Sequence, residues 1–491
     1  MGLLRELNKI RGGWPGGWKQ HARGYTVADQ TPPFEVPQNP DDRRSLIPPL
    51  GLKEYWYPAL PDKDVGWKKP VGLKICGEEL VFFRDKEGKV AALWDYCPHR
   101  GAYLSWGDCF WKGFVSCPYH GATFDGNGEC VEFITEGPDS KMVGRVKAKK
   151  YPTITLKGVV FVWMGEEEPV DPKEDLPPEL FESDPNTMVA NTFRYWYCNW
   201  MIALENTSDA HNCFYVHRDS LIQARTRLGG RARTPIGYPS KIINDKVVST
   251  DGRADMTNRG NVANYYADES GKIPYQMYYP RAGGVWPLHR KRLAWTWFFE
   301  LAGKVSKNWN KQSFDTPAEW LGMRLPGMQR LRFGPPGGVY TRWCVPVEAD
   351  LTRAVYFRSI RVHGLMGRIW ERVSFSLYRN WIYHYNFSDQ DYDAMRSCRY
   401  QFTEYLSATD SHVVAERRLM TEHARGLKKT FEINAVTTAE KQVMEAHELM
   451  GVQRDASEDY AFDSLQGNGH ENGDANGGSG EQKVEATARD S

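Results

Sequence analysis

The stretch that decides the fold is Cys97-Pro98-His99, followed after seventeen residues by Cys117-Pro118-Tyr119-His120. Each arm supplies one thiolate and one imidazole, so the two arms together can hold one metal centre. Thiolate ligands select zinc, copper(I) or iron–sulfur clusters. In Cys2His2 zinc sites, cysteine usually pairs with cysteine along the chain and histidine with histidine. Each arm here carries one of each, which favours an iron–sulfur centre over zinc.

Both arms open with Cys-Pro and are followed by a glycine, Gly101 or Gly121. Proline fixes φ and removes a donor, while glycine permits a tight turn. We therefore expect loops whose backbone N–H groups are free to point at sulfur. The chain around the arms, from about 50 to 165, has a β pattern. Hairpins are predicted where Leu80–Phe83 and Val90–Leu93 flank Lys-Glu-Gly-Lys, and at Asp125–Gly128.

Composition excludes several classes of protein. The chain has 491 residues, enough for two or three domains, and a net charge of only +1, so no global field favours nucleic acid. No run approaches the eighteen apolar residues of a membrane helix, and the start lacks the apolar core of a secretory signal. Its 9 cysteines show no disulfide-like spacing, as expected in a reducing compartment. We expect a soluble cytoplasmic protein.

A second metal site is predicted between Glu205 and His217. This stretch contains His211 and His217, which we expect on one short helical segment; both can bind one metal if the helix is distorted or ends between them. With one distant carboxylate, two histidines form the 2-His-1-carboxylate triad, which leaves iron(II) positions open for O2. A histidine pair alone would be interpreted as ordinary core or surface residues. The electron-carrying centre upstream favours the metal site, because something must receive its electrons.

These motifs resemble the catalytic α subunit of the Rieske non-heme iron oxygenases, a group of ring-hydroxylating dioxygenases, O- and N-demethylases and ketosteroid hydroxylases. The resemblance covers about residues 50–430 and rests on Cys97-x-His99-x17-Cys117-x2-His120. More weakly, His217-Arg218-Asp219-Ser220 is similar to carbazole-dioxygenase-like members. The resemblance to this family implies a [2Fe–2S] Rieske cluster held by Cys97, His99, Cys117 and His120. It also implies a mononuclear Fe(II) held by His211, His217 and Asp391.

The fold implied by the resemblance is of the α+β class. An N-terminal all-β Rieske domain is followed by an α+β catalytic domain of the helix-grip, START-like type. The expected parts are an extended arm (1–45), the Rieske domain (46–165), a linker (166–178), the catalytic domain (179–465) and a disordered tail (466–491). Helices are expected at about 367–385 and 390–430, and a strand at Ala294–Phe299.

The iron motif departs from the family's usual D-x2-H-x4-H pattern. Asp209 to His211 is one residue short, and His211 to His217 is one residue long. Strict register counted back from His217 would place Asn212 at the first ligand position. We favour His211, because imidazole is a better iron ligand than a neutral amide, and Asn212 stays open as the alternative.

The carboxylate ligand is expected in Asp389-Gln390-Asp391-Tyr392-Asp393. Asp391 fits the family's Gln-Asp pair, whereas Asp389 and Asp393 are also explained as charges at a helix N-terminus. Asp209 resembles the aspartate that bridges the iron site of one subunit to a Rieske histidine of the next, here His211 and a neighbour's His120. Asn206 matches the asparagine before that bridge, although a hydrogen bond at the helix start explains it equally well.

The resemblance implies a terminal oxygenase that hydroxylates or demethylates an apolar or aromatic substrate with O2. Electrons come from a separate reductase, directly or through a ferredoxin, because no G-x-G-x-x-G unit or second Cys cluster is visible. The bridge implies a ring of identical subunits, a trimer. Two alternatives stay open: a cis-dihydroxylating ring dioxygenase, and a Rieske electron carrier without oxygenase activity. No nucleic acid or membrane partner is expected.

Overall fold

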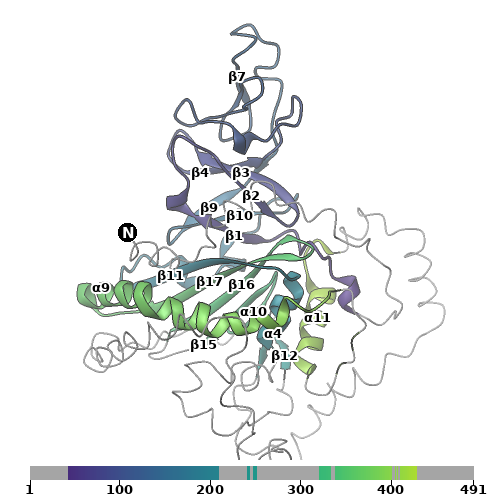
Figure 1. The fold of residues 1–491 in the computed structure, drawn as a ribbon, viewed down its shortest axis with the longest axis vertical. Helices are drawn as coiled ribbons and strands as arrows, with labels where there is room; N and C mark the ends of the chain where they lie inside the picture. Colours follow the sequence, from purple (N-terminus) through teal and green to yellow (C-terminus); the bar gives the residue numbers. More distant parts are fainter. Residues whose placement is uncertain are drawn as a thin grey trace, which may run out of the picture. The chain divides into compact units, whose positions relative to one another are not determined.

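The computed structural model describes residues 43–208, 240–243, 247–250, 320–332, 338–400, 404, 406 and 410–427. Within these residues, three small antiparallel sheets precede one large antiparallel sheet with a helical layer (Figure 1). The predicted strand at Ala294–Phe299 lies outside the described residues, as do nearly all of the predicted arm and the whole of the predicted tail.

The small sheets contain the segment with the two Cys-His arms. The first has the order β1-β10-β9, the second β2-β3-β4-β8 and the third β5-β6-β7. Their bounds are β1 (Trp56–Pro61), β2 (Val71–Ile75), β3 (Glu78–Arg84), β4 (Val90–Trp94), β5 (Val115–Ser116), β6 (Ala122–Phe124), β7 (Cys130–Phe133), β8 (Lys150–Tyr151), β9 (Thr153–Leu156) and β10 (Val159–Trp163). Short 3-10 helices are η1 (Arg43–Leu46), η2 (Asp62–Asp64) and η3 (Leu104–Trp106).

Both predicted hairpins are present. β3 and β4 pair antiparallel, and the turn between them has Gly88 at φ 85°. The turn between β6 and β7 has Gly128 at φ 82°. A positive φ is readily adopted only by glycine, so these residues fix where each hairpin reverses. A Cβ on Gly128 would also lie 2.1 Å from the carbonyl oxygen of Ala148, so no side chain fits there.

The large sheet has seven strands in the order β11-β17-β16-β15-β14-β13-β12. The bounds are β11 (Thr187–Trp196), β12 (Ser240–Ile243), β13 (Val247–Thr250), β14 (Gly322–Arg324), β15 (Met328–Arg332), β16 (Val339–Glu348) and β17 (Leu351–Arg361). Each neighbouring pair is antiparallel. β17 is buried along almost its whole length, so both faces of the sheet are covered.

Side chains along β16 and β17 point alternately to the two faces of the sheet, and the two faces have different neighbours. Val355 and Phe357 on β17 lie on the face that carries Trp343, and this face packs on Phe161 of β10. Arg342 and Tyr356 are directly opposite one another on the other face. Successive residues of a strand point to opposite faces, so the second face receives the polar residues that meet the helices.

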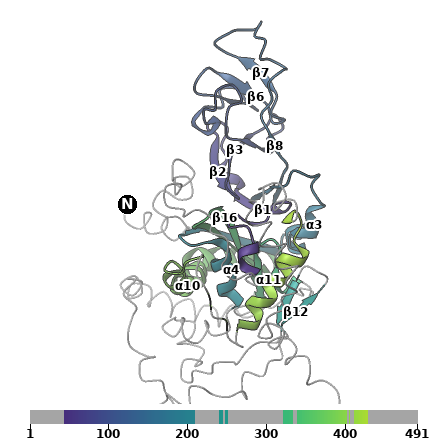
Figure 2. The same cartoon turned by 90° about the vertical axis from the view of Figure 1, so that its right-hand side faces the viewer.

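The helical layer is made of α4 (Trp200–Ser208) and a long stretch, α9 (Gly364–Ser374), η8 (Phe375–Arg379), η9 (Ile382–Phe387) and α10 (Ser388–Met395), with α11 (Ser411–His423) beyond it. Short helices α3 (Pro172–Asp175) and η4 (Pro178–Leu180) precede the sheet. Segments η8 and η9 are π-helical. The stretch from α9 to α10 runs alongside β11, β17 and β16 (Figure 1), and α4 contacts both β16 and α11 (Figure 2).

The predicted helix limits were partly wrong. The chain stays helical from 364 to 395, and α11 begins only at Ser411 instead of continuing from about 390. Beyond α10 the chain makes a tertiary contact instead, in which the hydroxyl of Tyr400 donates to the carbonyls of Arg44 (3.0 Å) and Ile47 (2.7 Å). In the stretch predicted as a linker, Asp175 is buried and accepts from Arg425 at 2.5 and 2.7 Å.

Candidate metal centres

The two Cys-His arms form loops with the same backbone geometry. The N–H of Cys97 donates to the carbonyl of Ala102, and that of Cys117 to Ala122, each at 2.8 Å. The loops turn at Gly101 and Gly121, with φ of 73° and 72°. Glycine therefore closes each loop in the left-handed region that other residues rarely adopt.

Four side chains meet between these loops as two pairs. Cys97 and Cys117 are buried, at 2% and 4% exposure, and their thiols are hydrogen-bonded to each other. The rings of His99 and His120 have centroids 4.9 Å apart, and His99 is exposed. The cysteines and the histidines thus form two adjacent pairs. A pair of cysteines and a pair of histidines fits a two-iron Rieske cluster.

Backbone donors surround the two sulfur atoms, as the sequence predicted. The N–H groups of His99 and Arg100 donate to Cys97, and those of Tyr119 and His120 to Cys117. The hydrogen bond from the Cys97 thiol, aided by these donors, lowers the pKa of Cys117 to about 6. The same pairing raises the pKa of Cys97. These loops are thus built to stabilise negative charge on sulfur, which is the form that binds iron.

The histidine end of the site faces outward. Tyr119 stacks on His120 with centroids 3.8 Å apart, and Phe133 meets His99 edge-on at 5.3 Å. Tyr119 is nevertheless 57% exposed. Trp106 is also 57% exposed and packs on Tyr103. The cysteines are therefore shielded, whereas the imidazole edge is open to a redox partner.

The second predicted site is only partly visible. Asp209, His211, Asn212 and His217 lie outside the described residues. Asn206, on the last turn of α4, and Asp391, on α10, are described, and the two helices are in contact. Arg342 of β16 connects them: one guanidinium nitrogen donates to the side-chain oxygen of Asn206 (3.2 Å), and another lies 3.8 Å from Asp391 Oδ2. The sheet therefore brings together residues 185 positions apart in the sequence.

The acidic candidates on α10 point to different partners. Asp389 forms an ion pair with Arg194 of β11, which also donates to the carbonyl of His384. Asp391 is buried at 3% exposure and faces Arg342 and α4. Only Asp391 of these two carboxylates is thus placed toward the helix that leads to His211 and His217. The structure does not describe the side chain of Asp393.

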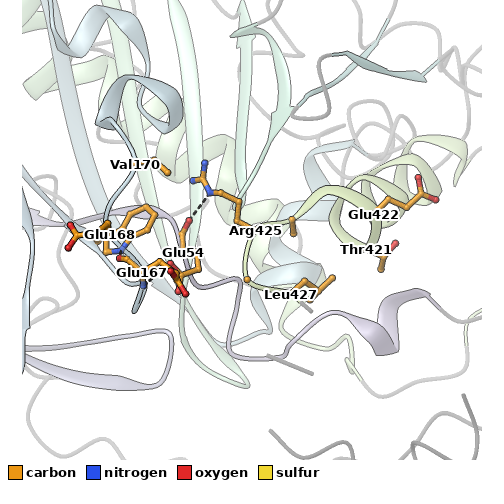
Figure 3. Close-up of a pocket in the computed structure, with 11 residues that line it drawn as sticks. Glu54, Glu167, Glu168, Val170, Thr421, Glu422, Arg425 and Leu427 are labelled. Atoms are coloured by element: carbon orange, nitrogen blue, oxygen red, sulfur yellow. Dashed lines mark hydrogen bonds between the residues drawn. The ribbon is translucent and has the colours of Figure 1, made fainter. Parts of the chain in front are cut away.

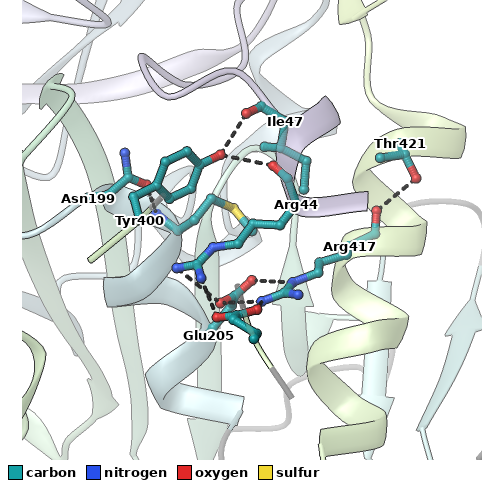
Figure 4. Close-up of polar contacts among 9 residues, drawn as sticks. Arg44, Ile47, Asn199, Glu205, Tyr400, Arg417 and Thr421 are labelled. Carbon is teal, nitrogen blue, oxygen red and sulfur yellow. Dashed lines mark hydrogen bonds and ion pairs between the residues drawn. The ribbon is translucent and has the colours of Figure 1, made fainter. Parts of the chain in front are cut away.

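Helix α4 is also held by buried charges that include a residue of α11. Glu205 accepts two hydrogen bonds from Arg417 of α11, at 2.7 and 3.1 Å, and lies 3.9 Å from Arg44 (Figure 4). All three residues are buried. Buried charges are tolerated when they are paired and hydrogen-bonded, and breaking such a pair is strongly destabilising. The start of the iron motif is therefore held on a rigid support.

Sequence reasoning missed two buried residues near this site, Arg342 and His384. A charged residue inside the apolar stretch Tyr340–Val345 was the available signal for Arg342. His384 is 1% exposed in the π-helical segment η9, with its ring 4.4 Å from Tyr356 and 5.7 Å from Tyr340. Neither ring nitrogen of His384 has a hydrogen-bond partner among the described residues. Such π segments occur frequently at functional sites.

Acid should destabilise the fold through His384. Burial, with the charges of Arg194 and Arg358, holds its pKa well below the usual 6.5. Below about pH 6.5 the unfolded chain therefore binds a proton that the folded chain does not, and stability falls by up to about 1.4 kcal/mol per pH unit. The melting temperature of His384→Phe should fall less than that of the wild type between pH 7.5 and 5.5, as measured by scanning fluorimetry. Equal losses would contradict this assignment.

A cleft also lies beside the end of α11. It has a volume of about 360 Å³ and is lined by Glu54, Glu167, Glu168, Glu422 and Arg425, among others (Figure 3). Arg425 donates to the carbonyl of Glu54 at 2.9 Å. Of the predicted ligands that the structure describes, none lines this cleft. In the described part of the chain, no helix has the length and apolar character that crossing a membrane requires.

Comparison with known proteins agrees with the first site. Residues 55–152 match the family model of the Rieske [2Fe-2S] domain. The chain is a homologue of the Rieske oxygenase α subunits. This Rieske oxygenase homologue is 28% identical to the terminal oxygenase component of carbazole 1,9a-dioxygenase from a Sphingomonas species, over 77% of this chain and 94% of the relative. It is 30% identical in sequence to the corresponding component from Metapseudomonas resinovorans, over 46% of this chain and 59% of the relative.

Solved structures of the same kind match at the level of the fold. The terminal oxygenase of carbazole 1,9a-dioxygenase from Nocardioides aromaticivorans is 26% identical, with a TM-score of 0.59 over 79% of this chain and 98% of that one. An oxygenase–ferredoxin complex of carbazole 1,9a-dioxygenase gives a TM-score of 0.56 at 21% identity, over 80% and 95% of the two chains. The predicted resemblance to Rieske oxygenase α subunits, the fold class and the enzyme class are confirmed.

Proposed function

We propose that this Rieske oxygenase homologue is a terminal oxygenase component that hydroxylates or demethylates a small apolar or aromatic substrate. The observation that carries the proposal is the presence, in one chain, of two complete Cys-His loops and a buried carboxylate, Asp391, facing the helix before His211 and His217. An electron carrier alone would need only the loops. The names of its relatives support the oxygenase reaction.

The residues present fit both metals. The donor-rich loops would hold the [2Fe–2S] cluster through two buried cysteines and two outward histidines, and a Rieske cluster passes single electrons. Asp391 would complete the iron(II) ligands together with His211 and His217. Iron held by two histidines and one carboxylate keeps positions open for O2. Arg342 contacts both α4 and α10, and Arg417 and Arg44 hold α4, so Asp391 is oriented relative to α4 before any metal binds.

We propose further that electrons arrive from a separate reductase through a ferredoxin. The oxygenase–ferredoxin complexes among the structural neighbours support such a partner, and the exposed imidazole edge at His99 supplies a place for electron entry. We also place the protein in the cytoplasm, as a homotrimer in which Asp209 of one subunit meets His120 of the next. The trimer rests on the resemblance of Asp209 to the family's bridging aspartate.

The proposed function is tested by turnover with a surrogate ferredoxin and its NADH-dependent reductase. We would supply ¹⁸O2 and three kinds of probe: carbazole, an aryl methyl ether and a steroid. We expect O2 consumption coupled to a product with one ¹⁸O atom, or formaldehyde released from the ether. A product with two ¹⁸O atoms would support cis-dihydroxylation instead. A protein whose cluster is reduced and reoxidised without forming any product would support the electron-carrier alternative.

A further inference from the structure

Arg342 occupies an unusual position for a cation. Its side chain is buried in the middle of β16, on the face of the sheet that meets the helices. One guanidinium nitrogen donates to the carbonyl of Ala203 at 2.5 Å and to Asn206 at 3.2 Å. A second nitrogen lies 3.8 Å from Asp391 Oδ2. One planar group therefore contacts both helices of the site.

The packing around Arg342 fixes the plane of the guanidinium. Its central carbon lies 5.0 Å from the ring centroid of Trp196, and Trp196 in turn stacks on Tyr392 with centroids 6.1 Å apart. Tyr392 is the neighbour of Asp391 in the chain. Arginine stacks on aromatic faces and presents its donors in a rigid fork, whereas lysine offers a single flexible charge. The arrangement thus uses the geometry of arginine as well as its charge.

We propose that Arg342 is a positioning residue for the iron site: it sets the location of Asp391 relative to the end of α4, from which the chain continues to Asp209, His211 and His217. This inference rests on the proposed iron site. The fork ties Asp391 to the last turn of α4, so the position of this carboxylate relative to α4 is set before iron binds. Groups that orient a metal ligand typically change metal affinity 10- to 100-fold when they are mutated.

A purely structural role would predict a different pattern, and the chain offers a matched control. Arg330 is also buried, on the neighbouring strand β15, and forms an ion pair with buried Glu179. It donates as well to Trp320 and Thr341, not to α4 or α10. Replacing either arginine removes a buried cation and leaves a carboxylate without it. Only Arg342 should alter iron binding in addition to stability.

The test uses full-length protein with its cluster intact and its mononuclear iron removed. We would measure the dissociation constant for Fe(II) by anaerobic competition with a chelator, for wild type, Arg342→Met, Arg342→Lys, Arg330→Met and Asp391→Ala. Arg342→Met should bind iron about 10- to 100-fold more weakly, and Arg342→Lys should lie between it and the wild type. Arg330→Met should bind as the wild type does. The electron paramagnetic resonance of the reduced cluster should be the same in all five proteins.

Failure of this inference and failure of the proposed function give different results. If Asp391→Ala loses iron while both Arg342 variants bind as tightly as the wild type, Arg342 does not position the ligand. If Arg330→Met weakens binding as much as Arg342→Met does, the effect is general destabilisation and the inference is also overturned. If Arg342→Met does not fold, Arg342→Lys decides between these outcomes. If the wild type binds no second iron, or Asp391→Ala binds it unchanged, the proposed iron site itself fails.

Discussion

Cys97→Ser should abolish the Rieske spectrum of the purified protein. A serine hydroxyl is a hard, neutral donor, whereas the cluster needs soft thiolates. Cys97 is buried and receives backbone N–H donors placed for a charged sulfur, so no other ligand can take its position in this loop. His120→Cys should remove the Rieske signature as well, because histidine ligands are what distinguish this cluster. Visible absorption and electron paramagnetic resonance after reduction measure both effects.

The wild-type cluster should have a reduction potential in the Rieske range, roughly −150 to +300 mV. Two neutral imidazoles replace two thiolates, which lowers the negative charge, and the N–H donors to sulfur act in the same direction. Cys130→Ser is the matched control, since Cys130 is a buried thiol in the same core. It should keep the spectrum. A potential near that of plant-type ferredoxins, or an intact spectrum in Cys97→Ser, would refute the assignment.

Asp209→Asn should lower turnover by orders of magnitude while both metals stay bound. If Asp209 bridges His211 and a neighbouring subunit's His120, its charge orients an imidazole N–H and shortens the path for electrons. Asparagine keeps the size and one acceptor but loses the charge. The cluster of the variant should still be reducible, and its iron content should equal that of the wild type. Stopped-flow measurement of cluster oxidation would locate the lost step.

Mixed rings test whether electrons cross between subunits. A trimer combining Asp209→Asn subunits with His120→Cys subunits has some interfaces where an intact cluster meets an intact bridge, so activity should partly return. Closed cyclic assembly is required for this, and light scattering would show it. A fully active monomer would exclude transfer between subunits. So would a mixed ring no more active than either parent.

The sequence was most informative where the chemistry is local. The ligands Cys97 to His120 lie within one short stretch, and the proline and glycine of each arm determine the loop around its own cysteine. The iron site depends on distant contacts. Asn206 and Asp391 lie on different helices and both contact Arg342 of β16. No local sequence pattern predicts these contacts. Asp391 was chosen from its neighbours by resemblance, and its role, like those of His211 and His217, stays a prediction.

The start of α11 was misplaced for a similar reason. The sequence predicted one helix from about 390 to 430, but the chain is no longer helical at Tyr400, whose hydroxyl bonds to the carbonyls of Arg44 and Ile47. This contact joins segments more than 350 positions apart, and no local pattern predicts it. Secondary-structure propensity is a weak prior that tertiary context overrides.

The π-helical segments η8 and η9 make the length of the chain before Asp391 as important as its composition. Each residue added to or removed from a helix turns everything after it by about 100°. A one-residue deletion between Phe375 and Phe387 would therefore swing Asp391 away from Arg342, even if every remaining side chain were kept. In the evolution of such proteins, this stretch should accept substitutions far more readily than insertions or deletions.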